Sequence, residues 1–386
     1  MRIVLFTRYD PFKTRHGTEI FGKNLAIALA DAGHEIHLIF GSTPARLVLN
    51  DGERGDERLH SYLISHQTSQ VVREAEYMLR TRFSIQGILR DISPTVVIGV
   101  GAGQGLVFEE LRQRSSRPAL VYYAMDCMAQ EGNAIATLLN QEKASLWRRT
   151  YNHARYYWLE QADRKSCRNA DFIVATSRNT KDNLSRYYGV SEDKVVVNYL
   201  GIPDDYADGF SRSFPQVPSF FHIATSHERK GTTYLLKALR SLKESYRGPL
   251  HSIIRGAPDP RYLLQSEGLD VTFAPSCDVR QIYASCTALV VPSVSEGFCL
   301  PVVEAGAFGK PAIVSSAGSL PELVSDEESG YVVSVGDSEK LAQRIREFSD
   351  DNELVRRMGQ KALDRSRSFR ISDSARNLIR IIETYS

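Results

Sequence analysis

The feature of this sequence that most constrains its fold is the alternation of short apolar runs with amphipathic stretches. Near the start, an apolar run at 2–6 is followed by a loop with Pro and Gly, an amphipathic stretch at 19–32 and a second apolar run at 35–40. This order predicts a strand, a helix and a second strand parallel to the first. Further apolar runs follow at 96–100, 119–124, 172–176 and 194–200. The first half of the chain is therefore predicted to form a doubly wound parallel sheet.

The alternation stops at 201–219 and then begins again. This stretch is rich in Gly, Pro, Ser and Asp and has no periodicity, so it predicts a linker. The pattern beyond it predicts a second doubly wound α/β domain over 220–368, after a first domain over 1–200. A last helix within 369–386 is expected to cross back to the first domain. Ligands of such open sheets bind outside the carboxyl ends of the strands, so a cleft between the two domains is the expected site.

Composition and charge exclude several classes of protein. The 386 residues carry 48 Lys and Arg against 46 Asp and Glu, and a net charge of +2 argues against binding nucleic acid through bulk positive charge. Five cysteines without a CxxC pair argue against a disulfide framework or a cysteine zinc site, and favour a reducing compartment. No apolar run approaches the length of about 18 residues that spans a membrane, so we expect a cytoplasmic protein. No metal-ligand cluster stands out.

The segment 288–324 carries the clearest signs of chemistry. A buried strand is expected to end at Ser293, and a helix opens at Leu300 and Pro301 after a short loop. Pro is tolerated in a first turn because the N–H that it lacks would have no partner there. The other N–H groups of that turn and the helix dipole form a site suited to a phosphate group.

Two glutamates flank this predicted phosphate site. Glu304 lies one turn inside the helix, where the dipole favours its carboxylate and where it could accept hydrogen bonds from two adjacent sugar hydroxyls. Glu296 lies in the preceding loop and is expected to face the neighbouring part of the same cleft. The alternative is that both glutamates are ordinary surface acids, but the surrounding segment favours a binding role.

A basic pair, Arg229 and Lys230, stands between an apolar run at 220–225 and a helix that starts at Gly231. Breaking the bond between a sugar and a nucleoside diphosphate leaves negative charge on the departing phosphate, which cations in a water-poor cleft stabilise. Cations at a helix N-terminus oppose the helix dipole and therefore favour a nearby anion. The alternative is a pair of solvated side chains.

The segment EGFCLPVVEAGAFGK at 296–310 resembles the signature of glycosyltransferase family 4, in which two glutamates are separated by seven residues. The stretches at 309–322, 170–197 and 229–239 fit the same family, so the resemblance extends over most of the chain. It implies a GT-B fold, in which two Rossmann-like domains face each other across a cleft, with the acceptor on the first and the nucleotide-sugar donor on the second.

The resemblance also implies an activity and roles for residues. The expected enzyme is a retaining, metal-independent hexosyltransferase that moves a sugar from a nucleoside diphosphate to a hydroxyl of a glycan, a lipid-linked sugar or a small molecule, with no cofactor. Glu304 would hold the ribose, Glu296 would lie at the donor sugar, and Lys230, with Arg229 beside it, would neutralise the diphosphate. The backbone amides expected to face the diphosphate are those of Gly297, Phe298, Cys299 and Leu300.

A glycine-containing loop near the N-terminus, Arg15-His16-Gly17-Thr18-Glu19, resembles the GGxE loop of the family. The backbone of that loop approaches the donor phosphate and sugar. Gly17 suits such an approach because it has no Cβ, whereas His16 stands where the family commonly has another glycine. Gly17 could also be a simple turn glycine.

Two departures from the family pattern concern the donor. Thr225 stands where many members have an arginine, and Arg229 or Arg15 is expected to supply the missing cation. Met125 stands at a position where a histidine touches the donor sugar in many members, so only Asp126 of the usual pair remains. Three alternatives stay open: a sugar phosphorylase, a nucleotide-sugar epimerase, and a catalytically silent nucleotide-binding partner subunit.

The stretch 143–168 combines many Lys and Arg residues with interleaved aromatic residues and has only two acids, Glu160 and Asp163. A basic, aromatic helix of this kind can lie peripherally on an anionic membrane surface or meet a lipid diphosphate. The alternative is a helix whose aromatic stripe packs into the core while its basic face is solvated.

Overall fold

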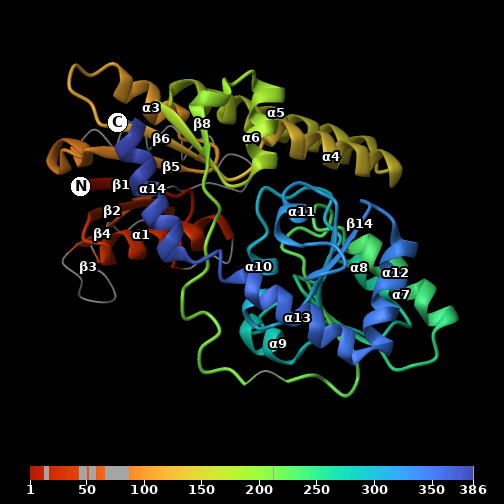
Figure 1. Cartoon of the computed structure of the whole chain (residues 1–386). Coiled ribbons are helices and arrows are strands. Elements are labelled where there is room, and N and C mark those ends of the chain that lie inside the picture. The colour runs from red at the N-terminus through yellow and green to blue at the C-terminus, as the bar shows by residue number, and fades with distance from the viewer. Residues whose placement is uncertain (13–16, 43–49, 52–57, 66–86, 212, 386) are drawn as a thin grey trace. The chain divides into compact units, whose positions relative to one another are not determined.

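The computed structural model describes residues 1–12, 17–42, 50–51, 58–65, 87–211 and 213–385. These residues form two compact α/β units, and their elements can be followed in Figure 1. Unit 1 comprises 1–132, 145–203 and 371–386, and unit 2 comprises 133–144 and 204–370. The sequence analysis places residues 133–144 in the first domain, whereas here they group with unit 2.

Unit 1 is built on an eight-stranded sheet with the order β3-β4-β2-β1-β5-β6-β7-β8. Neighbouring strands are parallel except for β3 and β4, which are antiparallel. The strands are β1 (Arg2–Phe6), β2 (Glu35–Ser42), β3 (Asn50–Asp51), β4 (Leu59–Ser65), β5 (Val96–Val100), β6 (Ala119–Ala124), β7 (Phe172–Ala175) and β8 (Val195–Val197). The parallel order that runs outward from β1 in both directions confirms the doubly wound architecture predicted for the first half of the chain.

Helices cover both faces of this sheet. They are α1 (Gly17–Asp31), α3 (Gly105–Arg112), α5 (Leu146–Asn169), α6 (Arg178–Tyr188) and α14 (Ile371–Tyr385), with a 3-10 turn η1 (Glu192–Lys194). Helix α4 (Met128–Gln141) begins in unit 1, but most of its residues group with unit 2. Successive residues of a strand face opposite sides, and β6 shows the consequence. The Tyr122 hydroxyl donates a hydrogen bond to Asp163 of α5, whereas the Tyr123 ring packs against Phe21 of α1 with 5.4 Å between centroids.

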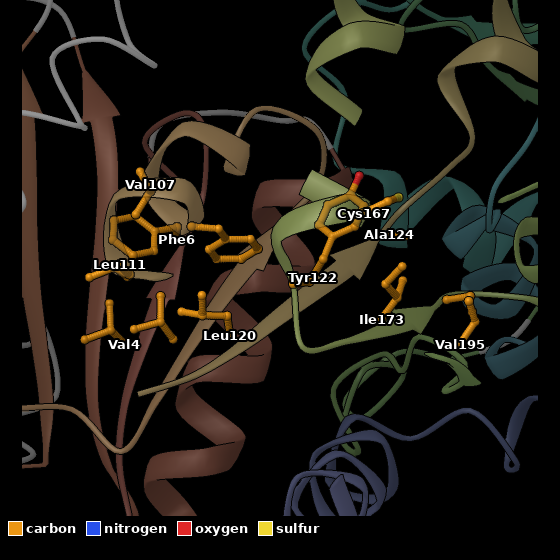
Figure 2. Close-up of a cluster of buried hydrophobic side chains, with 14 of the residues drawn as sticks. Val4, Phe6, Val107, Leu111, Leu120, Tyr122, Ala124, Cys167, Ile173 and Val195 are labelled. Atoms are coloured by element: carbon orange, nitrogen blue, oxygen red, sulfur yellow. The ribbon is translucent and has the colours of Figure 1, made fainter. Parts of the chain in front are cut away.

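The core on the side of α3 and α5 is drawn in Figure 2. Val4 and Phe6 of β1 and Leu120 of β6 pack there with Leu111 of α3 and Cys167 of α5, and all five side chains are buried. Because alternate strand residues supply this layer, the short apolar runs of the sequence are buried on both faces of the sheet.

The terminal helix α14 completes the opposite face of unit 1, where it packs against α1. Its first residue, Ile371, donates its N–H to the carbonyl of Ile202 at 2.8 Å. The buried Asn198 amide donates to the carbonyl of Ser374 at 3.0 Å. Helix α14 is therefore held by residues that lie just before the main segment of unit 2, 204–370, in the sequence.

Unit 2 is built on a six-stranded parallel sheet with the order β11-β10-β9-β12-β13-β14. The strands are β9 (Ser219–Ile223), β10 (His251–Arg255), β11 (Val271–Phe273), β12 (Ala288–Val291), β13 (Ala312–Ser315) and β14 (Gly330–Val333). The helices are α7 (Thr232–Ser245), α8 (Pro260–Ser266), α9 (Val279–Ser285), α10 (Leu300–Ala307), α11 (Leu320–Leu323), α12 (Ser338–Asp350) and α13 (Asn352–Ser366). The second doubly wound domain is thereby confirmed.

Short polar residues fix several helix ends. The Ser177 hydroxyl accepts the N–H of Thr180 at the start of α6, and Asp337 and Asp351 accept N–H groups at the starts of α12 and α13. These side chains satisfy backbone donors that have no partner within the helix. Across the described residues, no helix combines the length and apolar character that crossing a bilayer requires.

Candidate functional site

Glu296 is the centre of a buried charged cluster in unit 2. The residue is only 3% exposed, and Lys230 Nζ donates to its Oε1 at 2.6 Å while Arg229 donates to its Oε2 at 3.2 Å. The Ser293 hydroxyl also donates to Oε1, at 2.7 Å. Burial alone would raise the pKa of Glu296, but the two cations and these hydrogen bonds hold it below its ordinary value. The carboxyl group is therefore ionised at neutral pH.

Close backbone approaches hold this cluster in place. Gly231, directly after the two cations, has φ of +69°, and a Cβ there would lie 1.9 Å from the carbonyl oxygen of Pro292. Gly318 has φ of +55°, and a Cβ there would lie 1.8 Å from the carbonyl oxygen of Glu296. Only glycine fits either position. The loops after β12 and β13 and the start of α7 therefore meet at one point.

Helix α10 begins directly after this cluster. Its N-cap, Cys299, makes no side-chain capping hydrogen bond, and Pro301 lies in the first turn, as the sequence predicts. Burial raises the pKa of the Cys299 thiol to about 12, so the thiol stays protonated and packs as an apolar group. Leu300 is also buried, and the Phe298 ring packs edge-on against Phe369 at 5.8 Å.

Glu304 has partners of its own on α10. The Tyr283 hydroxyl donates to its Oε2 at 2.9 Å, and Tyr206 makes a second hydrogen bond to the carboxyl group. Burial raises the pKa of Glu304, and the hydrogen bonds from the two tyrosines offset only part of that rise. The tyrosines fix the orientation of the carboxyl group, as a ligand-binding acid requires.

Thr225 lies two residues beyond the end of β9 and is exposed. Arg229, one of the two residues expected to supply the cation missing at this position, forms an ion pair with Glu296; the other, Arg15, lies outside the described residues. Three side chains of the site escaped the sequence analysis: Ser293, Tyr283 and Tyr206. Ser293 could have been found, since it ends a predicted strand three residues before Glu296. Tyr206 carries no such signal, because it lies in the stretch predicted as a linker.

Other predicted residues lie in unit 1, at the carboxyl ends of its strands. Gly17 is the first residue of α1, and Met125 and Asp126 follow β6. A Cβ on Gly101, just after β5, would lie 3.5 Å from Thr18 and 3.8 Å from Met125, so these loops converge. The Asp126 carboxylate accepts the N–H of Cys127 at 2.8 Å. Arg15 and His16 lie outside the described residues.

Glu19, in the first turn of α1, is buried beside the same edge. Burial raises its pKa from 4.5 to about 7, against the opposing effect of a backbone hydrogen bond and of the charge of Arg8. Among the described residues, one group has the composition and spacing of a metal site: Glu35, His37 and His60. None of these three is a predicted site residue.

Two family models match this chain in succession. The model described as Glycosyltransferase Family 4 matches residues 15–206, and the model described as Glycosyl transferases group 1 matches residues 210–365. Together they extend over most of the chain, as the resemblance in the sequence predicts.

Curated relatives align over about half of their length. A D-inositol 3-phosphate glycosyltransferase of Streptomyces avermitilis is 30% identical over 228 residues, which cover 52% of this chain and 49% of the relative. An O-antigen chain mannosyltransferase B of Escherichia coli is 25% identical over 217 residues, which cover 51% of this chain and 56% of the relative. The chain thus spans about half the length of the curated relatives that it matches.

Solved structures share the fold over nearly the whole chain. A sucrose-phosphate synthase of Thermosynechococcus elongatus has a TM-score of 0.81 at 19% identity and covers 99% of this chain and 98% of its own. Anabaena HepE, solved in complex with UDP and glucose, has a TM-score of 0.71 at 16% identity, with all of both chains covered. WaaG, a glycosyltransferase involved in lipopolysaccharide biosynthesis, has a TM-score of 0.69 at 18% identity and covers 99% of both chains. The fold is therefore that of the GT-B enzymes.

Proposed function

We propose, since this chain belongs to glycosyltransferase family 4, that it transfers a hexose from a nucleoside-diphosphate donor to a hydroxyl acceptor with retention of anomeric configuration. The observation that carries the proposal is the buried cluster of Lys230, Arg229 and Glu296. Two cations and one carboxylate leave a net charge of about +1 in a site with little water. Such a site favours a diphosphate leaving group over a neutral ligand.

The two cations have different tasks in this proposal. Lys230 is nearly buried and tied to Glu296, so its ammonium group has a fixed position before any donor arrives. Arg229 is one-fifth exposed, and its planar guanidinium can contact two phosphate oxygens at once. Because both charges are in place beforehand, negative charge that develops on the leaving diphosphate is stabilised without reorganisation of the site.

Glu296 and Glu304 act on the two ends of the donor. Glu296 stays ionised between the cations and offers its negative charge beside the sugar ring, whose anomeric carbon becomes positive as the bond to phosphate lengthens. Glu304 is oriented by Tyr283 and Tyr206, which supports its role as the acceptor of ribose hydroxyl hydrogen bonds. A uridine diphosphate sugar is the first donor to test, since HepE binds UDP-glucose.

The acceptor is a hydroxyl compound in glycan, glycolipid or glycoside biosynthesis. The printed names of the relatives, an inositol phosphate glycosyltransferase and an O-antigen mannosyltransferase, support this class. We propose that the transfer needs no metal and no cofactor, because Lys230 and Arg229 supply the positive charge that a divalent cation would otherwise bring. None of the relatives described above favours a phosphorylase, an epimerase or a silent subunit.

The proposal is tested by product formation with purified protein. Candidate donors are chosen by thermal shift across UDP, GDP, ADP and dTDP sugars, since a ligand that binds the folded state raises Tm. Lys230→Ala is expected to lower kcat/KM by about 100-fold or more. Lys237→Ala, which removes an exposed lysine of helix α7, is the matched control and is expected to change nothing.

Three further results would count against the proposal. Nucleotide binding without any transfer in the wild-type protein would support a silent subunit. Product of inverted configuration, read by NMR of the anomeric proton, would contradict the retaining mechanism. Loss of all transfer after dialysis against EDTA, with recovery on adding Mg²⁺, would contradict metal independence.

We also propose that helix α5 rests on an anionic membrane surface. Both tryptophans of the chain lie on it, Trp147 at 78% exposed and Trp158 at 71%, and Leu146, Tyr151 and Tyr157 are exposed as well. The alternative in which the aromatic stripe packs inward is wrong for the two tryptophans, Tyr151 and Tyr157, although Tyr156 is buried. At about 100° per residue, positions 147, 151 and 158 lie within roughly 40° of one another on the helix.

The charges of α5 support an anionic partner. The residues 146–159 include Arg148, Arg149 and Arg155 and no acid. Arg148 and Arg155 fall on one flank of the aromatic face, at about 80–100° from Trp147 around the helix. Aromatic rings at headgroup depth, flanked by arginines, are typical of helices that lie in an anionic interface. The protein would then meet a lipid-linked acceptor at the cytoplasmic face of the membrane.

Sedimentation with liposomes tests this surface. The wild-type chain is expected to pellet with vesicles that contain anionic lipid and not with purely zwitterionic ones. Because each basic residue near the surface contributes about 1 kcal/mol, Arg148→Glu with Arg155→Glu should weaken binding by more than 10-fold. Leu263→Ser with Leu264→Ser, which removes two exposed leucines from α8, is the control. Equal pelleting of both double variants would remove the membrane proposal and leave the transferase proposal intact.

A further inference from the structure

We infer that Glu35, His37 and His60 form a binding site for a divalent transition-metal ion of the Zn²⁺ class. The three residues come from β2 and β4, which are neighbouring parallel strands in the sheet of unit 1. His37 and His60 are register partners, and Glu35 lies two residues before His37 on the same strand. Side chains at i and i+2 share a face of a sheet, so the register places all three side chains together.

The distances between the side chains are close to those of a metal site. His37 Nε2 lies 3.0 Å from Glu35 Oε1, and the His37 and His60 rings are stacked with 4.8 Å between centroids. One ligand atom from each residue lies within 4.8 Å of the other two. In tetrahedral zinc sites with Zn–N of about 2.0–2.1 Å, ligand atoms lie roughly 3.3 Å apart. Small rotations of the half-exposed Glu35 and of His60 would bring the three ligand atoms to that shorter separation.

A hydrogen bond to a second residue orients the buried ring of His37. The hydroxyl of Tyr62, two residues after His60 on β4, lies 3.0 Å from His37 Nδ1. A metal-bound histidine usually has its other ring nitrogen hydrogen-bonded to a protein group, which fixes the tautomer and the ring orientation. With Tyr62 on Nδ1, the nitrogen of His37 that faces Glu35 and His60 is the one that would bind the ion.

The ligand types define the ion. Two imidazoles and one carboxylate suit Zn²⁺, Co²⁺, Ni²⁺ or Cu²⁺, whereas Mg²⁺ and Ca²⁺ prefer sites made of oxygen alone. The carboxylate supplies one negative charge. Arg2, whose charge is felt at His37, opposes a cation, although its guanidinium donates to the carbonyl of Ile92 at 2.7 Å. We therefore expect this site to bind the metal ion with moderate affinity, more weakly than a zinc finger binds Zn²⁺.

This site is separate from the transfer chemistry proposed above. Glu35 is the first residue of β2, so the cluster lies at the amino ends of the strands, whereas Gly101 and Met125 lie at their carboxyl ends. A metal there would join β2 to β4 and stabilise that side of the sheet. Metal binding and sugar transfer can consequently be measured apart, and either can fail without the other.

Calorimetric titration of the full chain with ZnCl₂, after dialysis against EDTA, tests the inference. One Zn²⁺ per chain is expected to bind and to raise Tm. Loss of a single ligand should weaken binding by at least about 10-fold in His60→Gln and in Glu35→Gln. His251→Gln is the matched control, since His251 also pairs with a carboxylate, Asp270, at 2.8 Å, and no third ligand group completes a cluster with it among the described residues. MgCl₂ is expected to give no heat and no shift in Tm.

Two results would overturn the site. One is a wild-type chain that binds no Zn²⁺ below millimolar concentration. The other is an unchanged affinity in both ligand variants, which would place the ion elsewhere. Glu35 and His60 are only partly buried, so both variants are expected to fold, and their metal-free Tm is the check. If one variant unfolds, the other carries the test.

Discussion

At the scale of single residues, the charge balance around Glu296 decides what the site can bind. Its carboxylate forms ion pairs with both Lys230 and Arg229. This arrangement gives a nearly buried ammonium group a counter-charge, and an unpaired charge in that position would lower the stability of the fold. In the proposed donor complex, the diphosphate would add a second anion beside the two cations.

Glu296→Gln is expected to destabilise unit 2 and to abolish transfer. Removing one member of a buried ion pair costs about 3 kcal/mol or more, since the cations lose their counter-charge. The pH dependence has a definite sign. The pKa of Glu296 lies below its ordinary 4.5 in the folded state, so its contribution is present above pH 4.5 and is lost as pH falls through the lower value.

Denaturant unfolding at several pH values measures this effect. The wild-type chain should lose more stability between pH 5 and pH 3 than the glutamine variant does. Glu328→Gln, which changes an exposed acid of unit 2, serves as the control and should follow the wild-type curve. A Glu296→Gln curve parallel to the wild type would mean that the cations do not stabilise the carboxylate.

The pH dependence of stability that Glu19 contributes has the opposite sign to that of Glu296. Burial raises the pKa of Glu19 from 4.5 to about 7, so the folded chain holds this proton more tightly than the unfolded chain. The contribution of Glu19 to stability is therefore fully present below pH 4.5 and is lost as pH rises towards 7, by up to about 3 kcal/mol. Glu19→Gln should remove this fall, whereas Glu192→Gln, an exposed acid of unit 1, should retain it. Unfolding curves at pH 5 and pH 8 that differ equally in both variants would contradict the prediction.

The sequence predicted the charged residues of the site better than their partners. Lys230, Arg229 and Glu296 were predicted because ligand chemistry needs those residue types at those positions, and the structure brings the three together. Tyr206 could not be predicted, because its contact with Glu304 depends on how an aperiodic stretch is placed. His37 and His60 lie 23 positions apart, and only the register of two strands makes them neighbours.

At the scale of elements, the start of α7 connects the cations to the sheet. Gly231 has φ of +69°, and an added Cβ would lie 1.9 Å from the carbonyl oxygen of Pro292. Gly231→Ala is therefore expected to cost at least about 2 kcal/mol, from strain and from displacement of the loop, and to lower transfer through Lys230. Gly189→Ala is the matched control. It has φ of +66° but no atom within 4 Å of its Cβ position, so only about 1 kcal/mol is expected.

Equal losses of stability in the two glycine variants, measured by thermal unfolding, would mean that the crowding at Pro292 does not contribute to the free energy of unfolding.

The strands and helices were well predicted from the sequence, because parallel strands that are buried on both faces appear as continuous apolar runs. The residues at which these elements begin and end were predicted less well. The basic, aromatic stretch 143–168 was treated as one helix, and α5 is that helix, but it begins only at Leu146, with Ser145 as its N-cap.

At the scale of the whole molecule, each unit has its own core, and the chain passes from unit 1 to unit 2 and back. Leu378 of α14 is fully buried in unit 1. Leu378→Ala is expected to cost that unit about 3 kcal/mol, as cavity-forming substitutions do. Val355→Ala, at a buried position of α13 in unit 2, is the comparison.

Differential scanning calorimetry separates the two effects. A nucleotide that binds the cations of unit 2 should raise the transition of that unit and so identify it. Leu378→Ala should lower the other transition, and Val355→Ala should lower the one that responds to nucleotide. A single transition that moves equally in both variants would show that the two units unfold together.

The placement of α14 has a consequence for how the protein is made. A nascent chain emerges from its N-terminus, and domains usually fold in that order as they leave the ribosome. Here the sheet that is synthesised first lacks the helix that packs against α1 until residues 371–385 have been translated. Unit 2 already has all of its strands by then. The unit that begins first is thus completed last, and the apolar surface of α1 that α14 covers stays without this helix while unit 2 is synthesised. Exposed apolar surface of this kind is what chaperones bind, so we expect unit 1 to depend on them more than unit 2 does.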